Sequence, residues 1–339
     1  MRAVLISDVE NKKAHAGYKA RFDVMKIAIK KGMPILYVTS DHRGQTIKGI
    51  VERLKCCIGL FRHLKIDDLV FINYPNNNIY VKFLFLLKSV RKIRLIAIIH
   101  DLDSLRSLKN KDEDFLPAFD GLISHNDKMS VHLAALTNKP IHNLGIFDYI
   151  IESQQENVFS INEYSSRQLI YVGNLNYLKS SFIYDYRGKL EVWGNGFDKT
   201  HAQNKDINHK GVFDPNFPCD AFNGYKDKLV FGLVWDGNSA KNCEGVYGQY
   251  LKINNPHKTS FYLSQDLPVV IWKEAALASF VLEHDCGILI ESLDDAKVKI
   301  ENISTEEYSI LKYNAQKVGE KIRNGDFLNS AMDNFIRNE

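Results

Sequence analysis

A short segment near residue 257 combines the residue types that bind phosphate. The sequence there reads Asn-Asn-Pro-His-Lys-Thr-Ser over residues 254–260. Asn255 is a favoured N-cap and Pro256 suits a first helical position, so we predict that a helix begins here. A lysine in a first turn opposes the helix dipole, and a bound anion would remove that conflict. The segment therefore predicts a diphosphate site, with a plain surface lysine as the alternative; its residues are Asn255, His257, Lys258, Thr259 and Ser260.

The run Gly232–Gly237 ends an apolar segment with an aromatic residue and a carboxylate. Trp235 could pack on a base or a sugar ring, and Asp236 could accept hydrogen bonds from hydroxyl groups. The competing interpretation is a core tryptophan followed by a turn aspartate before glycine. We predict that both residues contact a ligand.

A second strand-like segment ends at Gly173 and Asn174. A glycine at a strand end lets the backbone approach a ligand closely. Tyr177 and Lys179 follow on the same predicted loop, and we add all four residues to the ligand-binding set.

Polar residues also follow the apolar run Leu95–Ile99, beginning with His100 and Asp101. A carboxylate or histidine at a strand end can remove a proton from an attacking hydroxyl group. We predict Asp101 as the general base with His100 beside it. The alternative is that Asp101 caps the next helix or pairs with Arg106.

The loop expected after the first strand, residues 14–21, is basic and contains glycine. We predict that it contacts an acceptor substrate, although a solvated loop explains it equally well. With Arg106, the acceptor-side residues are then Gly17, Lys19, Arg21 and Arg106.

Several well-known chemical signatures are absent from the sequence. There is no GxxxxGK[ST], no G-x-S-x-G, no HExxH and no complete GxGxxG; Gly194-Asn195-Gly196 lacks the third glycine. The five cysteines form no CxxC pair, so we expect reduced thiols and no structural zinc. No metal ligand set and no cofactor are predicted.

These residues must be positioned by alternating strands and helices. Strand-like runs are Ala3–Val9, Met33–Ser40, Asp67–Pro75, Arg94–Leu102, Gly121–Asn126, Ile141–Phe147, Gln168–Asn174, Leu190–Gly194, Asn208–Phe213, Leu229–Asp236, Leu267–Lys273 and Cys286–Ser292. Helix-like runs are Tyr18–Lys31, Gln45–His63, Asn78–Lys92, Asp127–Thr137, Pro256–Gln265, Ala275–His284, Thr305–Asn324 and Phe327–Arg337. The β-α alternation predicts an α/β fold with doubly wound parallel sheets.

The polar stretch 152–157 interrupts this alternation and predicts a linker. We therefore expect a Rossmann-like domain over 1–150, a second over 151–325, and a C-terminal helix, 326–339, that crosses back to the first. Ligands would bind in a cleft between the two domains.

The composition is that of a soluble globular protein, with 45% hydrophobic and 25% charged residues. Residues 1–150 hold 24 Lys and Arg against 15 Asp and Glu, a net charge of +9, while the remainder carries −6, giving +3 in total. A basic first half favours anionic partners, among them phospholipid head groups and pyrophosphate-linked acceptors, although solvated basic helix faces are the simpler interpretation.

No apolar run approaches the length that spans a bilayer, and the chain enters a strand-like run at once, so we expect no signal peptide and a cytoplasmic location. The basic, apolar run 82–94 could contact a membrane surface peripherally, although a core-packed helix is favoured.

Read together, the segments 232–237, 247–252, 254–263 and 267–270 resemble one family of enzymes. The chain is similar to bacterial β-1,6-galactofuranosyltransferases of O-antigen and capsule synthesis, and to GT-B glucosyltransferases that extend GlcNAc on serine-rich streptococcal adhesins. The resemblance covers nearly the whole chain. It implies a GT-B fold whose second domain holds a UDP-sugar donor, Lys258 as a diphosphate contact, and the 173–179 loop as a donor contact.

The resemblance also implies metal-independent transfer of a hexose, galactofuranose or glucose, onto a surface-glycan acceptor, which could be linked to a lipid pyrophosphate. The family's arginine in the 173–179 loop has no match, and Tyr177 or Lys179 replaces it. A retaining E-x7-E pair is missing because Glu274 and Glu283 are nine residues apart, which favours inversion. A homo-oligomer is compatible with the family, and no nucleic-acid partner is expected. A non-catalytic sugar-nucleotide-binding protein and, less well supported, a nicotinamide oxidoreductase are the alternatives.

Overall fold

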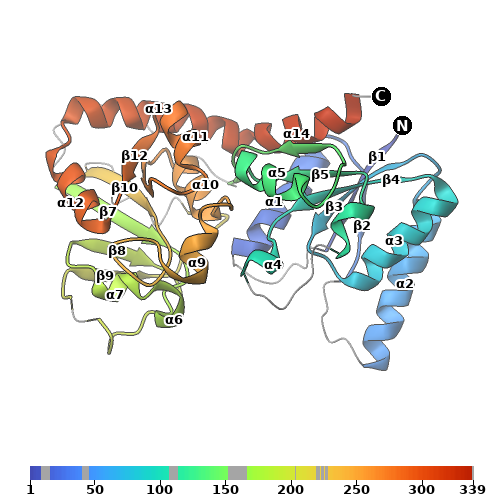
Figure 1. Cartoon of the computed structure of the whole chain (residues 1–339), viewed down its shortest axis with the longest axis horizontal. Coiled ribbons are helices and arrows are strands. Elements are labelled where there is room, and N and C mark those ends of the chain that lie inside the picture. Colours follow the sequence, from blue (N-terminus) through green and yellow to red (C-terminus); the bar gives the residue numbers. More distant parts are fainter. Residues whose placement is uncertain are drawn as a thin grey trace. The chain divides into compact units, whose positions relative to one another are not determined.

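A computed structural model gives the fold of the chain (Figure 1). It describes residues 1–8, 16–39, 46–106, 114–151, 166–202, 204–218, 222, 225 and 228–337. Contacts between Cα atoms divide the chain into two compact units: unit 1 is Met1–Gly145 with Gly325–Glu339, and unit 2 is Ile146–Asn324. The first unit therefore includes the C-terminal segment, and the division falls five residues before the position expected from sequence.

The sheet of unit 1 is parallel throughout and has the strand order β2-β1-β3-β4-β5-β6. Its central strands are largely apolar because helices cover both faces, and every residue of β3, including Asn73, is buried. The strands are β1 (Ala3–Ser7), β2 (Ile35–Tyr37), β3 (Leu69–Tyr74), β4 (Arg94–Ile99), β5 (Gly121–Ser124) and β6 (Ile141–Asn143).

The helices of unit 1 begin at side-chain caps wherever the sequence offers Thr or Asn. Thr46, Asn77 and Asn126 each accept a hydrogen bond from a backbone N–H in the first turn of the following helix. Helix α14 contacts α1, β5 and β6, while α2 contacts α3. The helices are α1 (Ala16–Lys30), α2 (Ile47–His63), α3 (Asn78–Arg91), α4 (Asp103–Arg106), the 3-10 turn η2 (Leu116–Ala118), α5 (Asp127–Ala134) and α14 (Asp326–Arg337).

The sheet of unit 2 is also parallel and has the order β12-β11-β10-β7-β8-β9. Numbered along the chain within the unit, this is the 3-2-1-4-5-6 order of dinucleotide-binding folds, which reverses direction between β7 and β10. The strands are β7 (Ser166–Val172), β8 (Leu190–Trp193), β9 (Ile207–Gly211), β10 (Lys228–Val234), β11 (Val269–Trp272) and β12 (Gly287–Ile290).

Helices of unit 2 connect these strands, and α10 packs on both β10 and β11 as well as on the long helix α13 (Figure 1). The helices are α6 (Tyr177–Ser180), α7 (Phe182–Asp185), α9 (Gly245–Tyr250), α10 (His257–Ser264), α11 (Ala278–Glu283), α12 (Leu293–Asn302) and α13 (Thr305–Asn324). Within the described part of the chain, no helix has the length and apolar character needed to cross a membrane.

The predicted doubly wound α/β fold is confirmed, and each of the twelve expected strands is present. Several strands end earlier than predicted because their last polar residues leave the sheet at its carboxyl edge. Five helices were not predicted: α4, α6, α7, α9 and α12. Apart from α12 these have only four to six residues, too few to show a helical period.

Candidate active site

Polar side chains gather where the strand order of unit 2 reverses. Strands β7 and β10 pair in register up to Ile170 and Gly232. Beyond that point β7 leads into Gly173 and Asn174, and β10 leads into Trp235 and Asp236. Open α/β folds bind ligands at the carboxyl ends of the strands at such a reversal. Two of the segments predicted to bind a ligand therefore lie at the same edge of the sheet.

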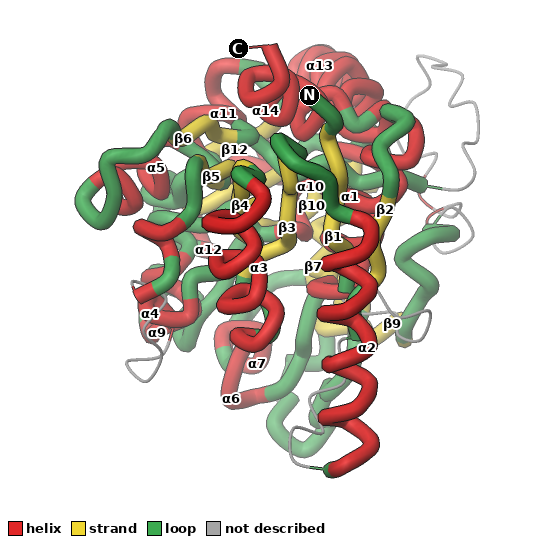
Figure 2. The backbone as a smooth tube through the Cα atoms, turned by 90° about the vertical axis from the view of Figure 1, so that its right-hand side faces the viewer, coloured by secondary structure: helices red, strands yellow, loops and turns green. Residues whose placement is uncertain are grey.

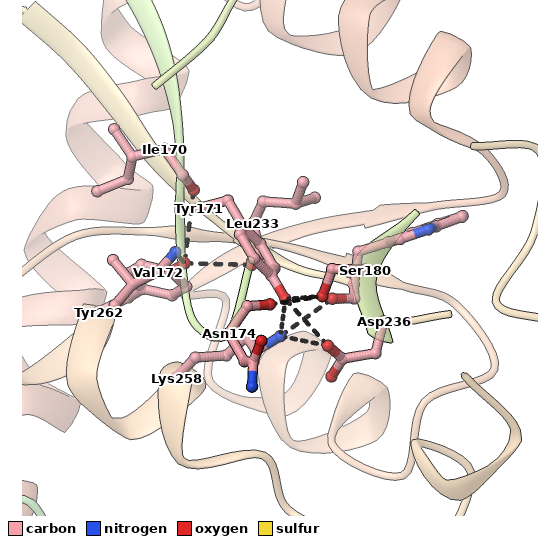
Figure 3. A network of polar contacts seen from close by, with 10 residues as sticks. Ile170, Tyr171, Val172, Asn174, Ser180, Leu233, Asp236, Lys258 and Tyr262 are labelled. Carbon is pink, nitrogen blue, oxygen red and sulfur yellow. Dashed lines mark hydrogen bonds and ion pairs between the residues drawn. The ribbon is translucent and has the colours of Figure 1, made fainter. Parts of the chain in front are cut away.

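Tyr262 of α10 holds the ends of β7 and β10 at a fixed separation. Its hydroxyl accepts a hydrogen bond from the Val172 N–H at 2.7 Å and lies 3.3 Å from the Leu233 carbonyl (Figure 3). The ring passes over Gly232, where a Cβ atom would lie 2.1 Å from the ring. The tyrosine thus stands in for the missing strand-to-strand hydrogen bonds, and the two strands can diverge without leaving buried backbone groups unpaired.

Lys258, Asp236 and Tyr171 form the centre of this polar cluster (Figure 3). The Lys258 amine donates to Asp236 Oδ1 at 2.7 Å, to the Tyr171 hydroxyl at 3.0 Å and to the Trp235 carbonyl at 3.0 Å. The Tyr171 hydroxyl in turn donates to the same Asp236 oxygen at 3.1 Å. The lysine has three N–H donors, so all of them are engaged.

The ion pair between Lys258 and Asp236 is largely buried. The Lys258 and Asp236 side chains are only 11% and 15% exposed, so water screens their attraction less than at an open surface. Tyr171 is 1% exposed. Its burial, followed by the charge of Asp236, raises the pKa of Tyr171 well above the usual value of 10, which keeps the hydroxyl protonated as a donor. The cluster therefore holds the Lys258 ammonium in a fixed position at a strand end, with Asp236 balancing its charge.

The loop after β7 lies against the loop after β8. Gly173 donates its N–H to the Trp193 carbonyl, and its own carbonyl would lie 1.8 Å from a Cβ atom at residue 194. Gly194 has a φ of +143°, so only glycine fits this approach. Asn174 is exposed, and its carbonyl accepts a hydrogen bond from Ser180 at 2.7 Å.

Two residues predicted on that loop lie instead on the short helix α6, which Asn176 caps. Tyr177 is 39% exposed and stacks on His201 with ring centroids 4.2 Å apart. Lys179 lies 5.0 Å over the ring of Tyr247. These contacts direct both side chains toward His201 and Tyr247 rather than toward the Lys258 amine.

The start of α10 differs from the prediction by one residue. Pro256 is the N-cap with an extended backbone (φ −68°, ψ 128°), and His257 is the first helical residue. Asn255 is therefore not the cap, because it lies one residue too early, and it is buried. Pro256 offers no side-chain cap to the first turn, in which the Thr259 N–H donates to the Pro256 carbonyl at 3.0 Å.

The remaining residues of this segment point into unit 2. Thr259 and Ser260 are 0% and 1% exposed, and their hydroxyl oxygens have no hydrogen-bond partner among the residues that the structure describes. The His257 ring packs between Phe147 and Tyr149, at 5.1 and 5.6 Å. Lys258 alone of the predicted diphosphate set directs a charged group toward the strand ends.

Trp235 does not offer its ring to a ligand. It is fully buried, donates Nε1–H to the Ser239 carbonyl at 3.0 Å, and meets Trp272 edge to face. Here the core interpretation describes the residue, since a fully buried indole packed on Trp272 of β11 has no face open to a base or a sugar. Asp236, one residue later, reaches the cluster.

In unit 1, His100 and Asp101 follow β4 as predicted. The His100 ring nitrogen Nε2 lies 2.9 Å from Asn73 Oδ1, and its backbone N–H donates to the Tyr74 carbonyl. With Asn73 as acceptor, Nε2 carries the ring proton and Nδ1 keeps its lone pair. Asp101 is half-buried. These two residues sit at the carboxyl end of their sheet, as a base must.

The acceptor-side residues predicted on the loop 14–21 lie on α1 instead. Lys19 is 1% exposed and forms an ion pair with Asp23, which places its charge inside unit 1. Arg21 bonds Asp8 and the Pro75 carbonyl, and so ties the ends of β1 and β3. Gly17 falls on α1 and Arg106 on α4, and the Arg106 side chain lies outside the described part of the structure.

Sequence reasoning missed three members of the cluster, Tyr171, Ser180 and Tyr262. The signal for Tyr262 was the pairing of a strand glycine, Gly232, with a tyrosine on the next helix. The other two gave no separate signal, because a tyrosine within an apolar strand resembles any core residue. A cavity of 330 Å³ beside Lys189 and Asp206 lies at the opposite, amino edge of the sheet, away from the strand ends that bind ligands.

Two parallel six-stranded sheets of this type define the GT-B class of glycosyltransferases, and solved structures agree. Sucrose-phosphate synthase from Thermosynechococcus elongatus matches with a TM-score of 0.62 at 10% identity, over 99% of this chain and 98% of that one. Anabaena Alr3699/HepE, solved in complex with UDP, matches with a TM-score of 0.57 at 12% identity over 100% of both chains.

Sequence comparison gives the family. Models of the glucosyltransferase 3-like N-terminal and C-terminal domains match residues 3–156 and 169–335. The β-1,6-galactofuranosyltransferase WbbI of Escherichia coli K12 is 31% identical over 342 residues, covering 98% of this chain and 97% of its own. The chain belongs to the glucosyltransferase 3-like family and is a glycosyltransferase. The predicted resemblance is confirmed, and the oxidoreductase alternative is set aside.

Proposed function

We propose that the protein transfers a hexose from a UDP-sugar to a hydroxyl group of a growing surface glycan in the cytoplasm. The observation that carries the proposal is the Tyr171–Asp236–Lys258 cluster at the strand reversal of unit 2. Family membership supports sugar transfer, and the fold shared with a protein solved in complex with UDP supports that nucleotide. A glycan carried on a lipid pyrophosphate is the acceptor that we favour.

The donor would lie across the ends of β7 and β10. Its diphosphate would accept hydrogen bonds from the uncapped first turn of α10 and from Lys258. Because the lysine's three donors are engaged, a phosphate oxygen would replace one of its present partners. Asp236 would then be free to accept hydrogen bonds from sugar hydroxyls. Asn174, exposed beside the cluster, is the second polar group in reach of the donor.

The reaction proposed is a single displacement with inversion. The acceptor oxygen forms a bond to the sugar C1, the bond from C1 to the phosphate oxygen breaks, and UDP leaves with the electron pair. Asp101 takes the proton of the acceptor hydroxyl, and His100 is the alternative base. Lys258 and the helix N-terminus stabilise the charge that develops on UDP, so the scheme needs no divalent metal.

Two sugars fit the comparisons. The E. coli relative is named for galactofuranose, whereas the family is named for glucose. A thermal-shift panel of UDP-galactofuranose, UDP-galactose, UDP-glucose and UDP-GlcNAc, followed by mass spectrometry of the products, identifies the donor. Binding of every donor without any transfer would support a non-catalytic sugar-nucleotide-binding protein instead.

Substitution of Lys258 and Asp101 tests the assignment of roles. Lys258→Ala should lower turnover about 100-fold and abolish stabilisation by UDP, because it removes the charge opposite the leaving group. Asp101→Asn should lower turnover by a similar factor while stabilisation by UDP remains. Lys273→Ala, at an exposed lysine paired with Glu291, is the matched control. EDTA should change none of these rates.

Lys258→Ala also leaves Asp236 without its cation, so Lys258→Gln, which keeps a donor for Asp236, is measured beside it with circular dichroism as a folding check. Unchanged turnover in the folded Lys258→Gln protein would contradict the diphosphate role. Loss of UDP binding in Asp101→Asn would contradict the separation of base from donor site. Loss of activity with EDTA that Mg²⁺ restores would overturn metal independence.

A further inference from the structure

Helix α2 presents a continuous apolar face to solvent. Its six large apolar side chains are between 42% and 82% exposed: Ile47, Ile50, Val51, Leu54, Ile58 and Phe61. At 3.6 residues per turn these positions fall within one arc of about 100°. A neighbouring arc attaches the helix to unit 1 through its buried residues, Gly49, Arg53, Cys57 and Leu60. The exposed apolar face is therefore additional to the one that the fold uses.

Cations border this apolar face. Lys48, Lys55 and Arg62 recur every seven residues, which aligns them along one edge of it. At the C-terminal end, the guanidinium of Arg91 on α3 lies 4.2 Å over the ring of Phe61. Glu52 is the one acidic residue of α2, and it is paired with Lys55 at 3.0 Å. The face is thus apolar in its centre and positively charged at its border.

The position of α2 within unit 1 leaves this face accessible to a broad surface. Figures 1 and 2 both show the N-terminal turns of α2 extending beyond its neighbour α3. For the basic run 82–94, sequence analysis favoured a core-packed helix over a membrane contact, and four apolar residues of α3 are indeed buried: Tyr80, Val81, Leu84 and Leu87. The apolar residues of α2 alternate with basic ones in the same way and remain exposed.

We propose that the exposed face of α2 binds the surface of an anionic phospholipid bilayer. An amphipathic helix with lysine and arginine beside its apolar residues lies in the plane of the head groups, with the apolar side chains inserted and the cations paired with lipid phosphates. Membrane binding would serve the proposed function, and this purpose rests on it, because an acceptor on a lipid pyrophosphate would be presented at such a surface.

A second copy of the chain is the competing occupant of this face. Two copies related by a two-fold axis, with their α2 helices antiparallel, would bring the two rows of Lys48, Lys55 and Arg62 to the same edge of the contact. Like charges facing one another oppose such a pairing, whereas an anionic lipid surface attracts them. For that antiparallel pairing, the charge pattern favours lipid over self-association.

Flotation of the full-length protein with lipid vesicles, without donor or acceptor, tests the proposal. Vesicles of phosphatidylcholine with phosphatidylglycerol should bind the protein, phosphatidylcholine alone should bind it weakly, and high salt should release it. Lys48→Gln with Lys55→Gln should weaken binding about fivefold per lysine. The charge-matched control is Lys189→Gln with Lys297→Gln, at two exposed lysines of unit 2.

The apolar contribution has its own pair of variants. Leu54→Ser with Ile58→Ser should lower binding about tenfold or more, while Val131→Ser, at a residue that is 73% exposed on α5, should not. Absence of binding to anionic vesicles overturns the proposal. So does a lipid-independent dimer, seen by sedimentation equilibrium, that Leu54→Ser with Ile58→Ser dissociates. UDP stabilisation is measured without lipid, so failure of the donor assignment and failure of this one are distinguishable.

Discussion

A lysine in the first turn of a helix meets the positive end of the helix dipole, and Lys258 shows how that unfavourable position can be offset. An unfavourable charge there costs about 0.3–1 kcal/mol. The amine escapes it by reaching the Trp235 carbonyl and Asp236 at the end of β10. Sequence reasoning found the conflict and assigned its solution to a bound anion, whereas the protein already supplies a carboxylate. Diphosphate binding by Lys258 thus requires that a phosphate oxygen replace one of its present partners.

Another residue, His125, lies outside every predicted set and gives a testable dependence on pH. It is 1% exposed, and Nε2 donates to the Ile99 carbonyl at 3.1 Å. Burial lowers the pKa of His125 from 6.5 to about 3. Between these two values the unfolded chain binds a proton that the folded chain does not. Stability is therefore complete above pH 6.5 and falls as the pH drops toward 3, by at most about 1.4 kcal/mol per pH unit.

His125→Gln should flatten this decline in the thermal midpoint on the acid side, because glutamine can keep a donor for the Ile99 carbonyl but does not titrate. The same substitution at the exposed His63 is the control. Thermal unfolding followed by circular dichroism from pH 6.5 downward measures both. An unchanged slope in His125→Gln would show that other groups cause the acid loss.

At the scale of elements, the Tyr262 hydroxyl determines how β7 and β10 diverge at the candidate site. Tyr262→Phe removes the acceptor of the Val172 N–H and leaves that backbone donor without it in a partly buried setting. We expect a loss of about 1–3 kcal/mol in the free energy of unfolding. Urea denaturation measures it, with Tyr313→Phe, at a tyrosine that is 53% exposed, as the control. Equal stability of the two variants would mean that the strands close without the tyrosine.

Tyr262→Phe should weaken donor binding more than it lowers the free energy of unfolding. The strand ends that carry Asn174 and Asp236 diverge where Tyr262 stands, so a shift there moves both residues. This contact is hard to predict from the sequence, because Tyr262 lies 90 residues from Val172 and no local pattern connects them.

At the scale of the whole molecule, most strands could be predicted because they are apolar runs between polar turns. Leu69–Tyr74, buried in every position, is an example. The β-α rhythm then fixed the doubly wound fold. The contacts of the candidate site could not be predicted: Lys258 and Tyr171 are 87 residues apart, and nothing in either segment specifies the other. Trp235 and Lys19 were assigned to ligands because a residue type does not reveal on which side of a strand or helix it lies.

The last helix of the chain completes the unit formed by the first 145 residues. Phe335 of α14 is 3% exposed, meets His142 edge to face at 4.7 Å, and covers Gly121 of β5 so closely that a Cβ atom there would lie 2.3 Å from its ring. Asp333 adds an ion pair at 2.6 Å with Lys31, the residue directly after α1. We expect Phe335→Ala to destabilise unit 1 by about 3–5 kcal/mol, because it leaves a cavity against Gly121 of β5, which has no side chain to fill it.

Hydrogen exchange of the full chain can localise that loss. Amides of β5 and β6 should exchange faster in Phe335→Ala, while those of β11 and β12 in unit 2 keep their protection, because the cavity touches only the first sheet. Arg337→Ala, at a side chain that is 79% exposed, is the control on the same helix and should change little. Equal acceleration in both units would show instead that they unfold as one cooperative body, with α14 stabilising the whole chain rather than its first sheet.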